Sequence, residues 1–191
     1  MDMLAESIDS WLRSACLEAR DAGRQLAQAP VMQRDAALVA VAGAIRRHRD
    51  AIMMANAQDI AAYSGTDAFR DRLLLTEARI EAIAAGVEIV AGLPDPLGGA
   101  LAEWERPNGL VIRRVPQPIG VIGMIYESRP NVGADAAAIC LKSGNAVILR
   151  GGSKSQHSAG AIHDAISEGL REAGLPGACV QIAPTTGREF V

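Results

Sequence analysis

Two short polar segments in the middle of the chain carry residue types that suit anion binding. Each segment directly follows an apolar run. Arginine and lysine supply cationic donors, serine supplies a hydroxyl, and glycine lets a ligand approach the backbone closely. The mixture therefore favours a phosphate or a carboxylate as ligand. The first segment contains Tyr126, Glu127, Ser128, Arg129, Pro130 and Asn131, and the second contains Arg150, Gly151, Gly152, Ser153 and Lys154.

The elements around these segments predict a strand, a helix and a second strand. The near-continuous apolar run 119–125 predicts a strand covered on both faces, as in a parallel sheet. Pro130 suits the first turn of a helix over 134–141, and Gly144 suits a left-handed cap at its end. Residues 146–149 predict the second strand. Because the carboxyl ends of parallel strands share one edge of a sheet, the two polar segments should meet there.

A second helix, over 155–173, is predicted directly after the second segment. Ser155 is its candidate N-cap, and Gly174 suits its end. The backbone N–H groups and the dipole at the start of this helix favour an anion there. A flexible turn with surface charge is the alternative. Residues 179–183 predict a third buried strand, and residues 184–191 are expected to begin a loop and then a helix.

The first half of the chain is predicted to be helical. Residues 2–29, 34–56 and 76–91 each show apolar residues at spacings of three and four, which predicts one helix for each range. Thr76 is a plausible N-cap of the last of these. The basic run 46–49 is interpreted as a solvated face, with an interface or an anion contact as the alternative.

A β-hairpin is predicted over residues 101–115. Its centre, Asn108-Gly109, indicates a type I′ turn, in which both central residues have positive φ. Such a hairpin projects from the body of a domain. A basic tip that contacts nucleic acid is a rival interpretation.

The amino-acid composition argues against several classes of function. The chain has 191 residues, of which 49% are hydrophobic and 21% charged, and its net charge is −3. These values predict an ordinary globular protein, and they argue against nucleic acid as the main partner. The start of the chain does not read as a signal peptide, and no stretch approaches the length of a membrane span, so we expect no membrane contact and a cytoplasmic location.

The metal-ligating and nucleophilic residue types form no recognisable set. The three histidines are isolated in sequence, so no metal site is predicted. Cys16, Cys140 and Cys179 are odd in number and widely spaced, which fits neither a disulfide framework nor a metal site. We interpret them as buried, unreactive thiols. A GxGxxG fingerprint is also absent from the sequence.

The amino-acid sequences of several segments resemble those of the gamma-glutamyl phosphate reductases (glutamate-5-semialdehyde dehydrogenases), which are aldehyde-dehydrogenase-like enzymes. The matching segments are DRLLLTEARIEAIAAG, LPDPLGG, RPNGLVIRRVPQPIGVIGMIYESRPNV and LKSGNAVILRGGS. The resemblance implies an α/β, aldehyde-dehydrogenase-like fold with N-terminal helices, an incomplete parallel Rossmann-type sheet and a β-hairpin. It divides the chain into a helical segment of the cofactor domain (1–97), an oligomerisation hairpin (98–117) and a partial NADP-binding unit (118–191).

The resemblance also implies a reaction and a cofactor. The reaction is the NADPH-dependent reduction of gamma-glutamyl phosphate to glutamate 5-semialdehyde in proline biosynthesis. The segment 150–154 corresponds to a strand exit that meets the adenosine ribose and, in NADP users, its 2′-phosphate. The hairpin implies a homodimer.

Roles for the first polar segment follow from the same resemblance. Ser128 falls where related enzymes carry an oxyanion-stabilising asparagine, and Glu127 lies beside it. Arg129 is expected to meet a carboxylate or phosphate of the substrate, with a structural salt bridge as the alternative. Asn131 is assigned to the same substrate site, or else it caps its own helix.

The catalytic cysteine of this family does not match any cysteine of the chain. By resemblance it belongs to a later domain beyond Val191. We therefore assign no catalytic residue and expect the isolated chain to be inactive. An inactive truncated fragment that only binds nucleotide or dimerises is the alternative, and an aldehyde dehydrogenase of another substrate is a further one.

Overall fold

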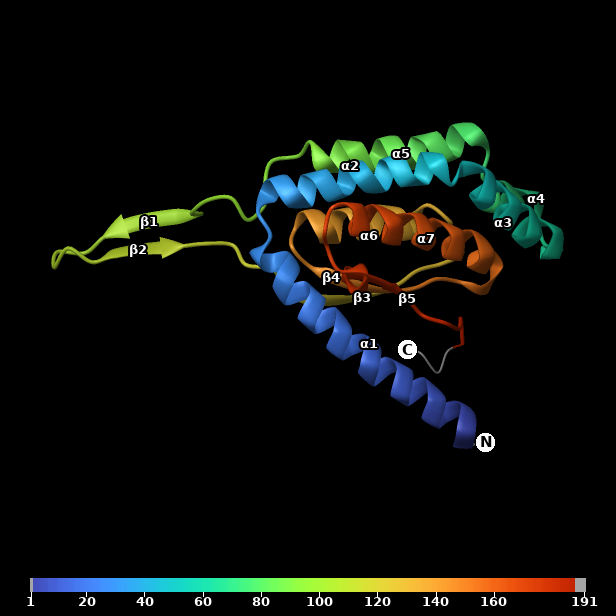
Figure 1. Cartoon of the computed structure of the whole chain (residues 1–191), viewed down its shortest axis with the longest axis horizontal. Coiled ribbons are helices and arrows are strands. Elements are labelled where there is room, and N and C mark those ends of the chain that lie inside the picture. The colour runs from blue at the N-terminus through green and yellow to red at the C-terminus, as the bar shows by residue number, and fades with distance from the viewer. Residues whose placement is uncertain (1, 188–191) are drawn as a thin grey trace.

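A computed structural model of the chain describes the backbone of residues 2–187 and the side chains of residues 8–187. A small parallel sheet lies among helices, and a two-stranded hairpin projects from one end of this body (Figure 1). The expected combination of N-terminal helices, parallel sheet and hairpin is confirmed. The helices are α1 (Asp2–Gln28), α2 (Val31–Arg47), α3 (Arg49–Ala62), α4 (Asp67–Leu73), α5 (Glu77–Ala91), α6 (Val132–Lys142) and α7 (Gln156–Glu172); the strands are β1 (Ala102–Glu105), β2 (Val111–Arg114), β3 (Val121–Ile125), β4 (Ala146–Arg150) and β5 (Val180–Ile182).

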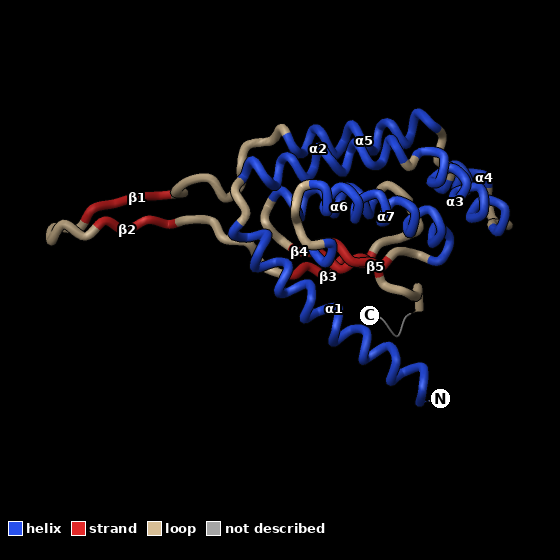
Figure 2. Tube along the Cα trace, in the orientation of Figure 1, coloured by secondary structure: helices blue, strands red, loops and turns tan. Residues whose placement is uncertain are grey.

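The parallel sheet has the strand order β3-β4-β5. Ile125 of β3 is paired with Arg150 of β4, and Leu149 with Ile182 of β5. Helix α6 connects β3 to β4 and α7 connects β4 to β5, so all three strands end at the same edge (Figure 2). Helices α6 and α7 pack on one face of the sheet, and α1 crosses the other face.

A second layer of helices covers α6 and α7. Helices α2 and α5 lie side by side in this layer, and α2 packs closely on α7. At the crossing of α2 and α7, a Cβ atom placed on Gly169 would lie 2.5 Å from both the N and the Cα of Val41. Glycine is therefore required for the two helix backbones to come this close.

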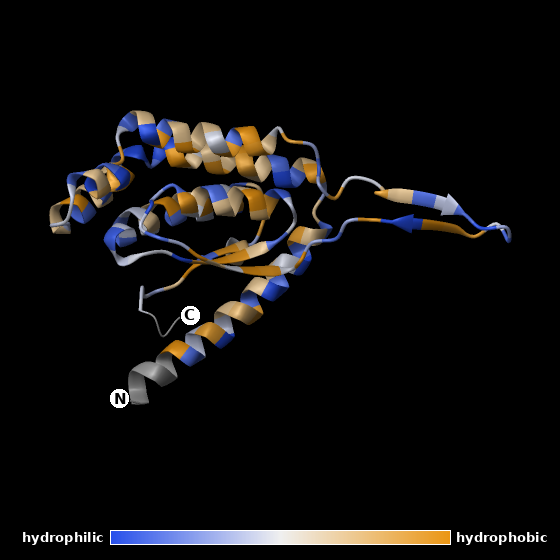
Figure 3. Cartoon of the chain, turned by 180° about the vertical axis from the view of Figure 1, so that it is seen from behind, coloured by the Kyte–Doolittle hydropathy of each residue, from blue (hydrophilic) through white to orange (hydrophobic). Residues whose placement is uncertain are grey.

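Strand β3 is less buried than its apolar sequence predicts. Apolar residues dominate the central strands (Figure 3), but Gly123 and Ile125 are exposed, and Ile119 before the strand is 84% exposed. Within the described residues, β3 pairs only with β4 and is an edge strand, whereas β4 has a strand on each side. The expectation of a strand covered on both faces is correct for most of β4 and wrong for β3.

The predicted helix over 34–56 is two helices. Helix α2 already begins at Val31, and the helical pattern is interrupted at His48, where α3 starts in a new direction. The Nε2 atom of His48 lies 2.7 Å from a carboxylate oxygen of Glu168 on α7. No glycine or proline stands beside His48, so the sequence carries no local signal for the break. Helix α4 was also not predicted.

The hairpin is present, but its turn differs from the prediction. Glu105 is paired with Val111, and the N–H of Gly109 donates to the carbonyl of Arg106 at 2.8 Å. Gly109 has φ +82°, whereas no described residue other than glycine has positive φ. The type I′ turn at Asn108-Gly109 is therefore wrong. Pro107 and Asn108 occupy the centre of a type I turn instead, and Gly109 follows it in the left-handed region, a combination in which proline is favoured at the first central position.

The predicted helix ends are mostly confirmed. The Thr76 hydroxyl accepts a hydrogen bond from the N–H of Arg79 at 3.2 Å, and Gly144 and Gly174 have φ of +72° and +70°. The loop after β5 is described as far as Gly187, so the helix expected near the end of the chain falls on residues 188–191, outside the described range. No helix in the described part is long and apolar enough to cross a membrane.

Candidate functional site

The two polar segments lie together at the carboxyl edge of the sheet, which confirms their expected placement. They line an open groove with a volume of about 570 Å³. The loop after β5 and the helix α4 complete its walls. The lining residues are Phe69, Ile125, Tyr126, Glu127, Ser128, Arg150, Gly152, Ser153 and Thr186.

The two segments are fastened to each other by close contacts. The N–H of Lys154 donates to the buried hydroxyl of Ser128 at 3.1 Å. A Cβ on Gly152 would lie 2.2 Å from that same hydroxyl oxygen, and one on Gly151 would lie 3.0 Å from the ring of Tyr126. Glycine is therefore needed at position 152 for packing between the loops, and a side chain at position 151 would press against the ring of Tyr126.

Several donors of the second segment have no acceptor among the described residues. One terminal nitrogen of Arg150 donates to the carbonyls of Thr186 and Gly187, but its Nε atom is buried with no hydrogen-bond acceptor. The side chains of Ser153 and Lys154 are exposed and form no hydrogen bond or ion pair within the described residues. The groove therefore offers unused donors to an anion.

The N-terminus of α7 already holds a carboxylate of the chain itself. Asp59 of α3, which is 4% exposed, accepts hydrogen bonds from the N–H groups of His157 at 3.2 Å and Ser158 at 2.8 Å. Two of the N–H groups expected to favour an external anion are thus already occupied by a carboxylate of the chain. A buried carboxylate satisfies the same N–H groups and interacts favourably with the helix dipole.

Ser155 is not the side-chain cap that the sequence suggested. It occupies the N-cap position, but its hydroxyl makes no capping bond and is buried without a partner among the described residues. Capping is achieved by Asp59, which also accepts from the Ser158 hydroxyl at 2.5 Å, while Asn56 donates to that hydroxyl at 3.0 Å. These contacts join α3 to α7 across about a hundred residues of sequence, so no local pattern could have predicted them.

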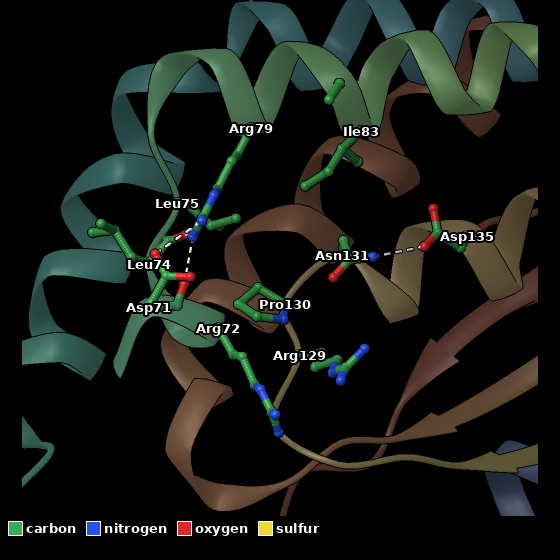
Figure 4. A pocket seen from close by; sticks show the side chains of 11 residues that line it. Asp71, Arg72, Leu74, Leu75, Arg79, Ile83, Arg129, Pro130, Asn131 and Asp135 are labelled. Atoms are coloured by element: carbon green, nitrogen blue, oxygen red, sulfur yellow. Dashed lines mark hydrogen bonds and ion pairs between the residues drawn. The ribbon is translucent and has the colours of Figure 1, made fainter. Parts of the chain in front are cut away.

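Arg129 and Asn131 face a second hollow. They line a pocket of about 410 Å³ between α4, α5 and the start of α6 (Figure 4). The structure thus divides the first segment, because Glu127 and Ser128 line the groove instead. The pocket is lined by Asp71, Arg72, Leu74, Leu75, Arg79, Ala82, Ile83, Arg129, Pro130, Asn131 and Asp135.

Details of this second hollow differ from the sequence-based expectations. Helix α6 begins at Val132, so Pro130 precedes the N-cap residue and does not lie in the first turn. Asn131 occupies the N-cap, but its amide donates to Asp135 at 2.8 Å and does not cap the helix. Arg129 is exposed and forms no ion pair within the described residues, so the structural salt bridge is not observed.

The cysteines are divided by burial. Burial raises the pKa of the Cys140 thiol, and it raises the pKa of the Cys179 thiol to about 11, which disfavours the reactive thiolate in both. Cys16 is exposed on α1, so the expectation of three buried thiols is wrong for this residue. Among the described residues, no three His, Cys, Asp or Glu side chains are arranged to hold a metal ion.

Comparison with known proteins connects this arrangement to one family. The family model described as the aldehyde dehydrogenase family matches residues 5–191. A gamma-glutamyl phosphate reductase of Acidiphilium cryptum is 63% identical over 191 residues, which are 100% of this chain and 46% of that protein. A second one, of Gluconobacter oxydans, is 62% identical over 175 residues, covering 91% of this chain and 41% of that protein.

Solved structures give the same relationship. The gamma-glutamyl phosphate reductase of Thermotoga maritima superposes with a TM-score of 0.91 at 37% identity, over 93% of this chain and 44% of that one. The corresponding protein of Saccharomyces cerevisiae gives a TM-score of 0.82 at 32% identity, over 93% and 47%. The fold is therefore aldehyde-dehydrogenase-like. The chain spans less than half the length of each of these relatives.

Proposed function

The chain belongs to the aldehyde dehydrogenase family, and we propose that it forms the N-terminal part of an NADPH-dependent reductase. The reaction we propose is the conversion of gamma-glutamyl phosphate to glutamate 5-semialdehyde, a step of proline biosynthesis. Identities above 60% to two gamma-glutamyl phosphate reductases support this substrate. The residues described here supply part of the cofactor site. In this proposal the unit 118–191 binds the cofactor, 1–97 supports it, and 98–117 is the oligomerisation hairpin.

The observation that carries the proposal is the set of unused donors in the groove at the strand exits. Arg150 has a buried Nε atom with no acceptor, and Lys154 has a free ammonium group within the described part of the chain. These groups, with the Ser153 hydroxyl, fit the 2′-phosphate of NADP and the ribose that carries it. Bound NADPH would supply the hydride for the reduction.

The position of Asp59 sharpens this assignment. Because its carboxylate occupies the N–H groups at the start of α7, a second anion there would meet like charge. The 2′-phosphate is therefore held by side chains of the second segment and not by the helix dipole. On the other wall of the groove, Ser128 accepts a hydrogen bond from Lys154 and keeps its own proton to donate, which suits the oxyanion role proposed for it. Glu127 is exposed beside it in the same groove, and we propose that it contacts the substrate.

We place the nucleophile of the reaction outside the cysteines of this chain. Cys140 and Cys179 are buried with raised pKa values, and Cys16 does not line the groove. We expect the purified chain to oxidise no glutamate 5-semialdehyde in the presence of NADP. Measurable turnover would contradict this part of the proposal.

We also propose that the hairpin pairs two copies of the chain. Apolar side chains on and beside β1 and β2 are exposed, among them Trp104 at 44% and Leu101 at 63%. Exposed apolar surface of this kind is typical of an interface. Light scattering after gel filtration tests the idea: a dimer is expected for the chain, a monomer for Trp104→Glu, and a monomeric parent chain would refute it.

Calorimetric titration with NADPH and NADH tests the cofactor site. The chain should bind NADPH more tightly than NADH, because NADH lacks the 2′-phosphate. Lys154→Gln and Arg150→Gln should weaken NADPH binding by about tenfold and leave NADH binding nearly unchanged. Arg20→Gln, at an exposed arginine of α1, is the matched control. The cofactor proposal fails if NADPH does not bind, or if Lys154→Gln leaves its affinity unchanged.

A further inference from the structure

The pocket between α4, α5 and the start of α6 contains both paired and unpaired charged side chains. Arg79 is paired, because it donates to the carboxylate of Asp71 at 2.9 Å and to the carbonyl of Leu74 at 2.9 Å (Figure 4). Arg72 and Arg129 line the same pocket, but neither forms an ion pair or hydrogen bond through its side chain within the described residues. Two guanidinium groups in one pocket are thus left without an anion.

The pocket also contains one carboxylate that can accept further hydrogen bonds. One oxygen of Asp135 accepts the amide of Asn131 at 2.8 Å, and the other has no partner among the described groups. Ile83, Leu75 and Pro130 supply apolar wall between the charged groups. A small ligand with a carboxylate, a nearby ammonium group and a short apolar stem would match these features.

The pocket and the groove are adjacent in the chain. Ser128 lines the groove and the next residue, Arg129, lines the pocket, so a single loop separates the two hollows. The proposal made below requires that a substrate held in the pocket by one end reaches the groove with its other end. This arrangement is required for any reaction in which a bound cofactor in the groove meets that substrate.

We propose that this pocket recognises the α-amino-acid end of the substrate. Arg72 and Arg129 bind the α-carboxylate, and Asp135 binds the α-ammonium group. The inference rests on the proposed function, since gamma-glutamyl phosphate carries an α-amino-acid group at the end opposite its acyl phosphate. Arginine suits this task because its planar guanidinium binds a carboxylate through two parallel hydrogen bonds.

Calorimetric titration of the chain with L-glutamate tests the pocket. Two probes that each lack one charged group are the comparison: glutarate has no ammonium group, and 4-aminobutyrate has no α-carboxylate. L-glutamate should bind more tightly than either. Arg72→Gln and Arg129→Gln should each weaken L-glutamate binding by about tenfold, whereas Asp135→Asn should weaken L-glutamate but not glutarate.

The controls separate this inference from the proposed function. Arg20→Gln should leave L-glutamate binding unchanged, and thermal melts should show that the pocket variants stay folded. Failure of L-glutamate to bind, equal binding of glutarate and L-glutamate, or unchanged affinity in both arginine variants would each overturn the inference. NADPH titration reports on the groove alone: NADPH binding without L-glutamate binding refutes only the pocket, and the reverse result refutes only the cofactor site.

Discussion

Two groups of cations in this molecule differ in whether the chain supplies their anions. The basic run Arg46–Arg49 is the densest cluster of positive charge in the sequence, yet its members are paired internally. Arg46 contacts Glu81 at 2.7 Å and Glu88 at 2.5 Å, which holds the pKa values of both carboxyl groups below their ordinary value. The interpretation of this run as a solvated face is confirmed, because Arg47 and Arg49 are exposed, but carboxylates of the chain already pair with their charges.

The cations near the carboxyl edge of the sheet are fewer, and most of them have no anionic partner among the described residues. Arg72, Arg129 and Lys154 form no ion pair within the described residues, and Arg150 keeps one buried donor unused. We propose from this comparison that unpaired charge, and not charge density, marks the binding surface. The comparison also predicts that changes in the helical layer affect stability, whereas changes at the edge affect ligand binding.

The largest effect is expected for Gly169→Ala at the crossing of α2 and α7. The added Cβ would lie 2.5 Å from two backbone atoms of Val41, so the helices must separate, and we expect a loss of about 3 kcal/mol in the free energy of unfolding. Gly160 lies on the same helix, and a Cβ placed on it would meet no neighbouring atom within 4 Å, so Gly160→Ala should instead stabilise the chain by up to about 1 kcal/mol. Urea denaturation measures both; equal effects would contradict the close contact.

Removing the carboxylate that caps α7 should have the next largest effect. Asp59→Ala leaves the N–H groups of His157 and Ser158 without their acceptor, and we expect a loss of about 2 kcal/mol. Asp164→Ala, at an exposed position of α7, is the control and should change stability little. If urea denaturation shows the two variants to be equally stable, Asp59 is not the cap.

The ion pairs of the basic run should make the stability of the chain depend on pH in the acidic range. The Arg46 guanidinium lowers the pKa values of Glu81 and Glu88 in the folded state, so their contribution is present above the ordinary carboxyl pKa of 4.5 and is lost as pH falls through the lowered values. Arg46→Gln should therefore reduce stability at neutral pH and show a smaller further loss on acidification. Thermal melts across this range measure the difference, and parallel curves for both proteins would argue against the pairing.

The smallest effect on stability is expected at the edge of the sheet. Arg72 makes no side-chain hydrogen bond or ion pair with the described residues, so Arg72→Gln should change the free energy of unfolding by no more than about 0.5 kcal/mol. Urea denaturation beside Arg46→Gln provides the comparison. A marked loss in Arg72→Gln would mean that this arginine serves the fold.

Local patterns in the sequence predicted much of the fold. The strand, helix and strand around residues 118–155, the Thr76 cap and the left-handed glycines at 144 and 174 all follow from signals within a few residues. The same signals placed both polar segments at one edge of the sheet. Such features depend on periodicity and backbone conformation, which adjacent residues determine.

The features that sequence could not predict depend on contacts between distant residues. Asp59 and Ser158 are 99 residues apart, and His48, at the break between α2 and α3, contacts Glu168, which is 120 residues away on another helix. The separation of Ser128 from Arg129 into two hollows depends on where α4 and α5 pack. The hairpin turn is centred on Pro107 and Asn108, one residue before the predicted centre at Asn108-Gly109, because Pro107 and Asn108-Gly109 are adjacent turn signals.

Hydrogen exchange of the chain, measured with and without NADPH, locates the ligand on the molecule and so shows whether the unpaired cations bind it. We expect slower exchange in the segments 126–131 and 150–155 at the strand exits, where the described residues leave cations unpaired. We expect no change around Arg46–Arg49, where the cations are already paired. Protection around Arg46–Arg49 instead of at the strand exits would mean that unpaired cations do not mark the ligand site.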